Sequence, residues 1–299
     1  MSQRRVRPSL ERLPYIITAG GSARSGKGTS MAFLKGTLEA DGKKVTNIDQ
    51  GGKFRTMAVA ALDAHIALDD PHAVERFLRT SNRPILRLLS AVATLDDAKR
   101  KELLYPSHVG EASAKIARVP DSHPIAIGLL EDEVKEAVDN QADVILIDGR
   151  AMHGHAKRIA GAGLGRHVLS WHFECDSFEA ARRSMSMFGS KEEVGPDDWE
   201  RLLAEEAKII ERNQTDMDRE VDPLRRPEIA YELSLPVEDS MISEHTAVDG
   251  AFANDRMVTL DTTHVGRDDM THVVAGISTA ALWREDYGLV FGREIEHVR

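Results

Sequence analysis

Short runs of apolar residues alternate along the chain with longer segments in which apolar positions recur every three or four residues. This alternation is typical of a parallel β-sheet whose strands are connected by helices. The runs that predict buried strands are 15–19, 45–48, 142–147, 167–173 and 257–260. The sequence therefore predicts an α/β fold in which about five parallel strands are flanked by helices.

The helical segments are delimited by glycine and proline. The predicted helices cover 27–40, 109–118, 123–140, 177–187, 197–219 and 268–283. From 54 to about 104 the pattern is also helical, and Pro71 and Pro84 divide it into shorter helices. Residues 233–256, which contain Pro236, predict a loop-rich insertion.

The chain is acidic: 39 Lys and Arg residues stand against 49 Asp and Glu residues, which gives a formal net charge of −10. Nucleic-acid backbones are bound by clustered cations, so this balance argues against a protein that wraps nucleic acid. A local basic pocket for a small phosphorylated ligand is compatible with it. The single cysteine, Cys175, excludes an internal disulfide and a CxxC zinc site, and we expect it to serve packing.

Residues 1–14 are predicted to form a disordered basic arm. Arg4, Arg5, Arg7 and Arg12 are followed by no apolar stretch of the kind that a secretory signal requires. No run approaches the ~18 apolar residues of a membrane span. We therefore expect a cytoplasmic protein without membrane contact and without a stable nucleic-acid complex, and a monomer is favoured.

The turn between the first predicted strand and helix carries the strongest motif. Residues 21–29 satisfy the phosphate-loop pattern GxxxxGK in the strand–turn–helix context that the pattern requires, and a loop that merely turns the chain is the weaker interpretation. Backbone N–H groups and the positive end of the following helix bind phosphate oxygens there, and Lys27 adds a mobile positive charge. Gly28 replaces the usual Ser or Thr after the lysine, so Thr29 is expected to take its place beside Mg²⁺. The predicted ATP-binding residues are Gly21, Ser22, Ala23, Arg24, Ser25, Gly26, Lys27, Gly28 and Thr29.

The residues at the end of the third predicted strand help to distinguish among the classes of P-loop NTPase-type proteins. A GTPase would carry an NKxD segment, and the sequence has none. ATPase motors place a longer acidic run at this point, whereas here Asp148 is followed at once by Gly149 and Arg150. The arginine indicates a second anion held opposite the phosphate loop.

Two further patterns join these motifs. Residues 49–55 end the second strand with Asp-x-Gly-x-x-x-Arg, and residues 212–219 read Arg-x-x-x-Asp-x-x-Arg. The chain resembles the bacterial cytidylate kinases, of the nucleoside monophosphate kinase group, in which the second strand ends in Asp-Ser/Thr-Gly-Ala-Met-Tyr-Arg and the lid carries Arg-Asp-x-x-Asp-x-x-Arg. The matching residues are Asp49, Gly51, Arg55, Arg212, Asp216 and Arg219. The other segments that carry the resemblance are 26–29, 109–120, 148–150 and 260–263.

The resemblance implies transfer of the ATP γ-phosphoryl group to a (d)CMP-like nucleoside monophosphate. Lys27 would stabilise the migrating group, and Thr29 and Asp148 would hold Mg²⁺ directly or through water. Arg55 and Arg150 would grip the acceptor phosphate, because a planar guanidinium suits two oxygens. The implied catalytic residues are Lys27, Arg150, Arg183, Arg212 and Arg219. The implied acceptor-binding residues are Asp49, Gly51, Arg55, Arg150, Arg212 and Arg219.

The resemblance also implies a layout of the chain. A kinase domain would cover 15–285, followed by a tail over 286–299. Its core would comprise 15–53, 140–180 and 257–285. Around this core would lie a helical acceptor-binding part over 54–125, a lid over about 183–226 and the insertion over 233–256.

The departures from the family pattern concentrate on the acceptor side. Where the family has Asp, Ser, Arg, a lid Asp and a Met-Tyr pair, this chain has Ala151, Ala114, His123, Asn213 and Lys53-Phe54. Lost hydrogen-bonding partners cost discrimination between substrates. Three functions therefore stay open: a cytidylate kinase, a P-loop kinase for another nucleotide or small acceptor, and a catalytically weak ATP-binding sensor.

Several of these residues also have a structural interpretation. Arg55 and Arg150 follow strand ends where ligand crevices form, which favours function over a surface role. His153 and His155 form an HxH pair that is a weak metal signal by itself, so hydrogen-bonded histidines are favoured. A solvated helix surface is the alternative for Arg183, Arg212 and Arg219.

Overall fold

A computed structural model of the protein describes residues 13–80, 85, 87–88, 91–92, 95–185, 195–234 and 244–287. Six strands form one sheet in the order β2-β3-β1-β4-β6-β5, and every neighbouring pair is parallel. The strands are β1 (Tyr15–Gly21), β2 (Val45–Asp49), β3 (Val144–Asp148), β4 (Arg166–Glu174), β5 (Tyr231–Ser234) and β6 (Met257–Asp261). The predicted P-loop-type α/β fold is confirmed, with one strand more than expected.

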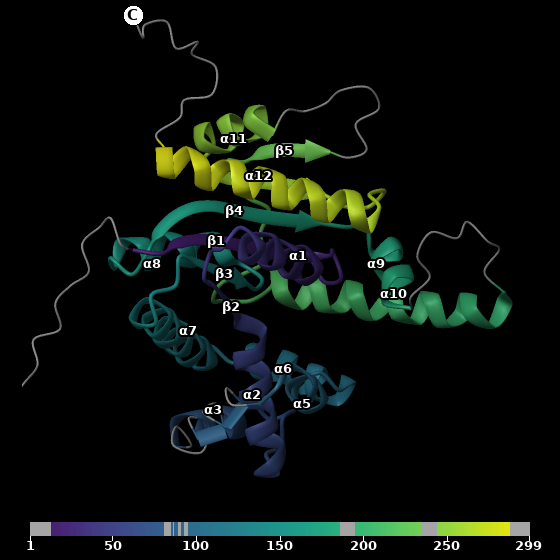
Figure 1. Cartoon of the computed structure of the whole chain (residues 1–299). Helices are drawn as coiled ribbons and strands as arrows, with labels where there is room; N and C mark the ends of the chain where they lie inside the picture. The colour runs from purple at the N-terminus through teal and green to yellow at the C-terminus, as the bar shows by residue number, and fades with distance from the viewer. Residues whose placement is uncertain are drawn as a thin grey trace, which may run out of the picture.

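Helices cover both faces of this sheet. Alternate residues of β1 point to opposite faces, so that Ile17 packs with α1 (Lys27–Ala40), α11 (Glu244–Ala253) and α12 (Arg267–Tyr287). Ile16 packs on the other face with α7 (Ser122–Asp139) and α8 (Met152–Gly161). In Figure 1 the strands follow one another from β2 at the bottom to β5 at the top, with α12 drawn between β4 and β5. The strands are therefore buried between two helical layers.

A second hydrophobic core lies outside the sheet. It is built by α2 (Gln50–Asp63), α3 (Pro71–Thr80), α5 (Asp97–Leu104) and α6 (Ser107–Ala117), together with residues of α7 such as Ala126. Figure 1 shows these helices as a separate group at the bottom, beyond β2. α2 begins directly after β2, so the glycines at 51 and 52 lie inside its first turn instead of ending the strand. Pro84, predicted to divide these helices, lies outside the described residues.

Two helices extend along the side of the sheet. α9 (Ser177–Ser184) and α10 (Pro196–Met217) pack together, and Leu202 and Ile209 of α10 share a small core with Ala23 of the phosphate loop. The carboxyl half of α10 is thereby held against the loop. The predicted end of the α9 segment at 187 lies outside the described residues, as do almost all of 1–14 and 286–299.

The structure corrects the prediction of a loop-rich insertion over 233–256. Its described residues include the end of β5 and the whole of α11. Gly250 lies inside α11, where a Cβ would clash with the ring of Tyr231, so this glycine serves helix–strand packing. Residues 152–161 were not predicted as a helix, and two glycines in this stretch weaken the helical pattern of α8. Within the described ranges, no helix combines the length and hydrophobicity needed to cross a bilayer.

Candidate active site

The phosphate loop connects β1 to α1. Gly21 and Gly26 have φ angles of 120° and 92°, which other residues rarely adopt, and a Cβ on Gly21 would clash with the backbone of Phe173. The Gly21 N–H donates to the carbonyl of Arg150 at 2.9 Å, and the Ser22 N–H donates to that of Phe173 at 3.0 Å. These bonds fix the loop to the carboxyl ends of β3 and β4.

Lys27 folds back over its own loop. Its Nζ donates to the carbonyl of Ser22 at 2.6 Å and to that of Gly21 at 3.2 Å. Burial and, after it, the nearby charge of Arg150 lower the pKa of Lys27 to about 7. A cation whose charged form is disfavoured in this way is stabilised by an added anion, which is what a polyphosphate supplies.

Two carboxylates end neighbouring strands beside this loop. Asp49 of β2 and Asp148 of β3 lie opposite each other in parallel register. Burial raises the pKa of Asp148 to about 6, while Lys27 acts in the opposite direction. A Cβ on Gly28 would lie 3.6 Å from Asp148 Oδ2, so the first turn of α1, with the exposed Thr29, comes directly to this carboxylate. A carboxylate and a hydroxyl fit Mg²⁺, which takes its remaining ligands from water and phosphate. Among the described residues, no three His, Cys, Asp or Glu side chains gather into a metal-binding group.

The carboxyl end of α10 brings further charges to the loop. Asp216 is 2% exposed and forms ion pairs with Arg150, at 3.0 Å from its Nε, and with Arg219. Arg150 also donates from Nη1 to the carbonyl of Gly21 at 3.1 Å, and burial lowers the pKa of Arg150. Arg212 acts electrostatically on both Arg150 and Lys27. The structure thus brings Lys27, Arg150, Arg212 and Arg219 together.

Asn213 holds α10 to the phosphate loop. Its Oδ1 accepts a hydrogen bond from the N–H of Ala23 at 2.9 Å. Arg24, the next residue of the loop, has a φ angle of 57° and an exposed side chain that acts electrostatically on Arg212. Asn213, one of the departures from the family pattern, therefore links α10 to the phosphate loop.

Three of the predicted acceptor-binding residues, Asp49, Gly51 and Arg55, meet at the start of α2. Arg55 Nη1 lies 3.9 Å from Asp49 Oδ2. A Cβ on Gly51 would lie 3.0 Å from Asp49 Oδ1 and 3.1 Å from Arg55 Nη1, which explains a glycine at this point. Sequence reasoning missed Tyr105, whose ring lies under the Arg55 guanidinium, 4.4 Å from the ring centroid to Cζ. A tyrosine 50 residues away from Arg55 in the chain carries no local signal of this contact.

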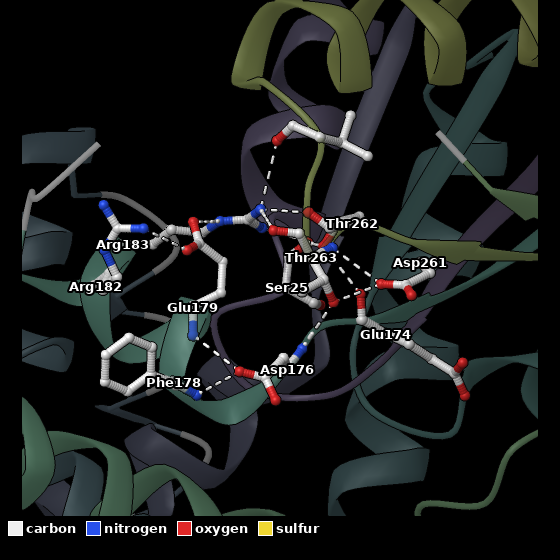
Figure 2. A network of polar contacts seen from close by, with 11 residues as sticks. Ser25, Glu174, Asp176, Phe178, Glu179, Arg182, Arg183, Asp261, Thr262 and Thr263 are labelled. Carbon is white, nitrogen blue, oxygen red and sulfur yellow. Dashed lines mark hydrogen bonds and ion pairs between the residues drawn. The ribbon is translucent and has the colours of Figure 1, made fainter. Parts of the chain in front are cut away.

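Arg183 does not join this cluster. Figure 2 shows its guanidinium against the loop that follows β6. It donates hydrogen bonds to the carbonyl of Thr262 and, at 3.1 Å, to the hydroxyl of the same residue. It also lies 3.4 Å from the carbonyls of Thr263 and Val265. On its other side it forms an ion pair with Glu179 at 3.3 Å. The hydroxyl of Thr262 in turn lies 3.1 Å from the carbonyl of Ser25, to which it donates. Arg183 therefore anchors the loop after β6 against the phosphate loop.

A pocket of about 440 Å³ opens beside the first turn of α1. It lies between α1 and the beginning of α12, and the ring of Phe33 on its wall packs against His272 with centroids 4.8 Å apart. Its lining residues are Gly28, Thr29, Ala32, Phe33, Arg267, Asp268 and Thr271. Sequence reasoning missed the residues that α12 contributes, because only the packing of α12 on α1 brings them to the loop.

The two histidines beside Asp148 have separate partners. His153 Nε2 lies 2.9 Å from Asp255, and His155 Nε2 lies 3.0 Å from Asp222. Each ring is thus engaged by a carboxylate, in agreement with the prediction that these histidines are hydrogen-bonded. Cys175 is partly buried among the residues that join α9 to α10, and burial raises the pKa of its thiol.

A parallel sheet with a glycine-rich loop between β1 and α1, and with lysine and arginine side chains around that loop, defines a P-loop nucleotide-binding phosphotransferase. A family model described as cytidylate kinase matches residues 17–244, well over half of the chain. The chain belongs to the cytidylate kinase family, and it is a nucleoside monophosphate kinase-like enzyme. A comparison with curated proteins found no match.

Proposed function

We propose that the protein transfers the γ-phosphoryl group of ATP to the phosphate of a (d)CMP-like nucleoside monophosphate. An oxygen of the acceptor phosphate forms a bond to the γ-phosphorus, and the bond from that phosphorus to the oxygen of ADP breaks. The observation that carries this proposal is the convergence of five cations on the carboxyl ends of β1, β2 and β3 in a chain whose net charge is −10. These cations are Lys27, Arg55, Arg150, Arg212 and Arg219.

Each cation has a place in this transfer. Lys27 stabilises the migrating group, and Arg150, which lies between the loop and Asp216, contacts both reacting phosphates. Arg55 grips the acceptor, while Arg212 of α10 and Arg219, which follows this helix, cover the phosphates. Such transfer requires little covalent chemistry from the protein, so positioning and charge stabilisation supply most of the acceleration.

The donor is proposed to lie along the phosphate loop, with its nucleoside in the 440 Å³ pocket beside Thr29 and Phe33. Thr29 and Asp148 would hold Mg²⁺, which neutralises phosphate charge when it is bound. The acceptor would lie beside Arg55, at the helical part that covers 54–125. Residues 183–226 would act as the lid, because α10 already reaches over the loop through Asn213.

A second candidate is a kinase of the same architecture for a different acceptor. It is favoured by the side chains that replace the family's acceptor-reading groups. Ala114 and Ala151 have no hydrogen-bonding side chain. His123 is 3% exposed and lies 2.9 Å from the carbonyl of Ala117, so it is turned away from an acceptor.

The test is ATP consumption by the purified chain with CMP, dCMP, UMP, dUMP, AMP, GMP and TMP. Selective turnover of CMP or dCMP supports the first candidate, and turnover of another acceptor supports the second. Lys27→Ala is expected to abolish transfer, and Arg55→Ala to raise the acceptor KM or lower kcat while ATP still binds. If the protein binds ATP but consumes none with any acceptor, the proposed transfer is contradicted. The ATP-binding sensor would then be the function that remains.

A further inference from the structure

The side chains that replace the family's acceptor-reading groups do not present hydrogen-bonding groups to an acceptor. Lys53 and Phe54 are 5% and 8% exposed, and Phe54 contacts the buried His123 with ring centroids 5.3 Å apart. Ala114 and Ala151 contribute only methyl groups. An acceptor bound in front of α2 must therefore be held by residues other than these.

Tyr105 reaches this place from the helical part. It follows α5 directly, and its hydroxyl donates to Asp49 Oδ2 at 2.6 Å. The guanidinium of Arg55 lies over its ring at 4.4 Å. Asp148 also acts electrostatically on its hydroxyl, which places Tyr105 at the carboxyl ends of both β2 and β3.

Tyr105 is held in place and yet, as a residue, 50% exposed. Single exposed aromatic side chains are common on protein surfaces. Tyr105 differs from them because a cation–π contact and a hydrogen bond to a carboxylate fix its orientation beside the proposed acceptor phosphate. Arg55 covers one face of the ring, so the opposite face is the one that a ligand could contact. A fixed and exposed aromatic face is the feature on which a flat heterocyclic base stacks.

We propose that Tyr105 is an acceptor-binding residue that stacks on the base of the acceptor while Arg55 grips its phosphate. The inference rests on the proposed transfer to a nucleoside monophosphate, and it names how the base is held. Stacking is tolerant of base identity, because every base has a π-face. This contact therefore favours nucleotides over other phosphates and does not by itself discriminate among bases.

The experiment compares the full-length wild type with Tyr105→Leu, Tyr105→Phe and the control Trp283→Leu. Trp283 is 51% exposed on α12, on the opposite side of the sheet from the helical part. Equilibrium binding of CMP, AMP and ribose 5-phosphate is measured by calorimetry, and acceptor and ATP KM values are measured by ATP consumption. Ribose 5-phosphate has a phosphate and no base, so it separates stacking from the grip of Arg55.

Tyr105→Leu is expected to weaken CMP and AMP binding roughly tenfold to hundredfold, with ribose 5-phosphate and the ATP KM unchanged. Tyr105→Phe retains the ring and is expected to retain the preference for CMP over ribose 5-phosphate, and Trp283→Leu to resemble the wild type. Unchanged CMP and AMP binding in Tyr105→Leu would overturn the inference. An equal loss for ribose 5-phosphate would also overturn it, because Tyr105 would then only support Arg55.

The two proposals fail in different ways. A wild type that binds CMP in a Tyr105-dependent way but transfers nothing contradicts the transfer and leaves the stacking role intact. A wild type that turns over an acceptor with the same KM in Tyr105→Leu contradicts the stacking role alone. A wild type that binds no nucleoside monophosphate contradicts both.

Discussion

At the scale of single residues, the site holds more positive charges than the buried carboxylate of Asp216 can neutralise. Asp216 is almost fully buried, and its carboxylate is shared by Arg150 and Arg219. Lys27 lies on the other side of Arg150, and its pKa is lowered to about 7 by burial and by that arginine. The acidic residue therefore holds cations in place before an anionic ligand arrives.

Asp216→Asn tests this arrangement through stability. Removing one partner of a buried ion pair leaves the other charges uncompensated, so the free energy of unfolding is expected to fall by about 3 kcal/mol. The measurement is urea denaturation without nucleotide. The control is Asp218→Asn, an exposed residue two positions later that accepts a hydrogen bond from Gln214 at 2.8 Å and is expected to change stability by less than about 0.5 kcal/mol. Equal effects of the two substitutions would refute the role of Asp216.

Residues whose chemistry is encoded within one short motif were predictable. The phosphate loop and the Asp-Gly-Arg turn each follow a strand, and their positions in the fold follow from that context. The contacts of Tyr105 and Asn213 could not be predicted from the sequence. Tyr105 contacts Asp49, which lies 56 residues away in the chain, and Asn213 contacts Ala23, which lies 190 residues away. Such contacts depend on how whole helices dock, which local patterning does not determine.

At the scale of elements, the loop after β6 is tied to the phosphate loop by one side chain of α9. Arg183 contacts this loop through Thr262, Thr263 and Val265, and Thr262 continues the chain of hydrogen bonds to Ser25 (Figure 2). Arg183 was predicted to act on the reacting phosphates. Its engagement with backbone carbonyls instead favours a positioning role for α9.

Arg183→Ala separates these two roles. Loss of hydrogen bonds from a charged donor is expected to lower the free energy of unfolding by about 2 kcal/mol and to raise the ATP KM more than it lowers kcat. Urea denaturation and steady-state kinetics measure the two effects. Arg182→Ala is the matched control, because this neighbouring arginine pairs with the same Glu179, at 3.1 Å, and is partly exposed. A large loss of kcat with wild-type stability would instead restore the catalytic role.

Elements with strong periodicity were predicted, and those that depend on packing were missed. The bounds of α1 agree with the prediction, because a glycine loop and the Asp41-Gly42 turn delimit it. β5 has four residues and α8 contains two glycines, so neither shows a clear pattern in the sequence. Both are stabilised by neighbours, since β5 pairs with β6 and α8 packs on β1 and β4.

At the scale of the whole molecule, the site lies between two hydrophobic cores. One set of apolar side chains packs on the two faces of the sheet, and the other fills the helical part. Asp222, in the segment after α10, connects them: it lies 3.0 Å from His155 Nε2 of α8 and 3.9 Å from His123 Nδ1 of α7. Its φ angle of 48° places the carboxylate at a turn that Asn also tolerates. A single carboxylate thus joins the segment after α10 to both α7 and α8.

Asp222→Asn is expected to lower stability in a pH-dependent way. The imidazole of His123 and, after it, that of His155 face this carboxylate and lower the pKa of Asp222 below its ordinary value of 3.8. Because the unfolded chain takes up this proton first on acidification, the stabilisation is complete well above pH 4 and is lost as the pH falls below that value. Loss of hydrogen bonds to a charged group predicts a deficit of about 2 kcal/mol at pH 7.

Thermal unfolding of the wild type and Asp222→Asn between pH 7 and pH 3 measures this deficit. The difference in stability should be widest at neutral pH and should narrow below about pH 4, since the protonated carboxyl of the wild type then resembles the amide of the variant. Asp132→Asn, at an exposed residue of α7 whose carboxylate pairs with Lys135 at 2.9 Å, should show little difference at any pH. A gap for Asp222→Asn that stays constant or widens on acidification would mean that this carboxylate does not carry the connection between the two cores.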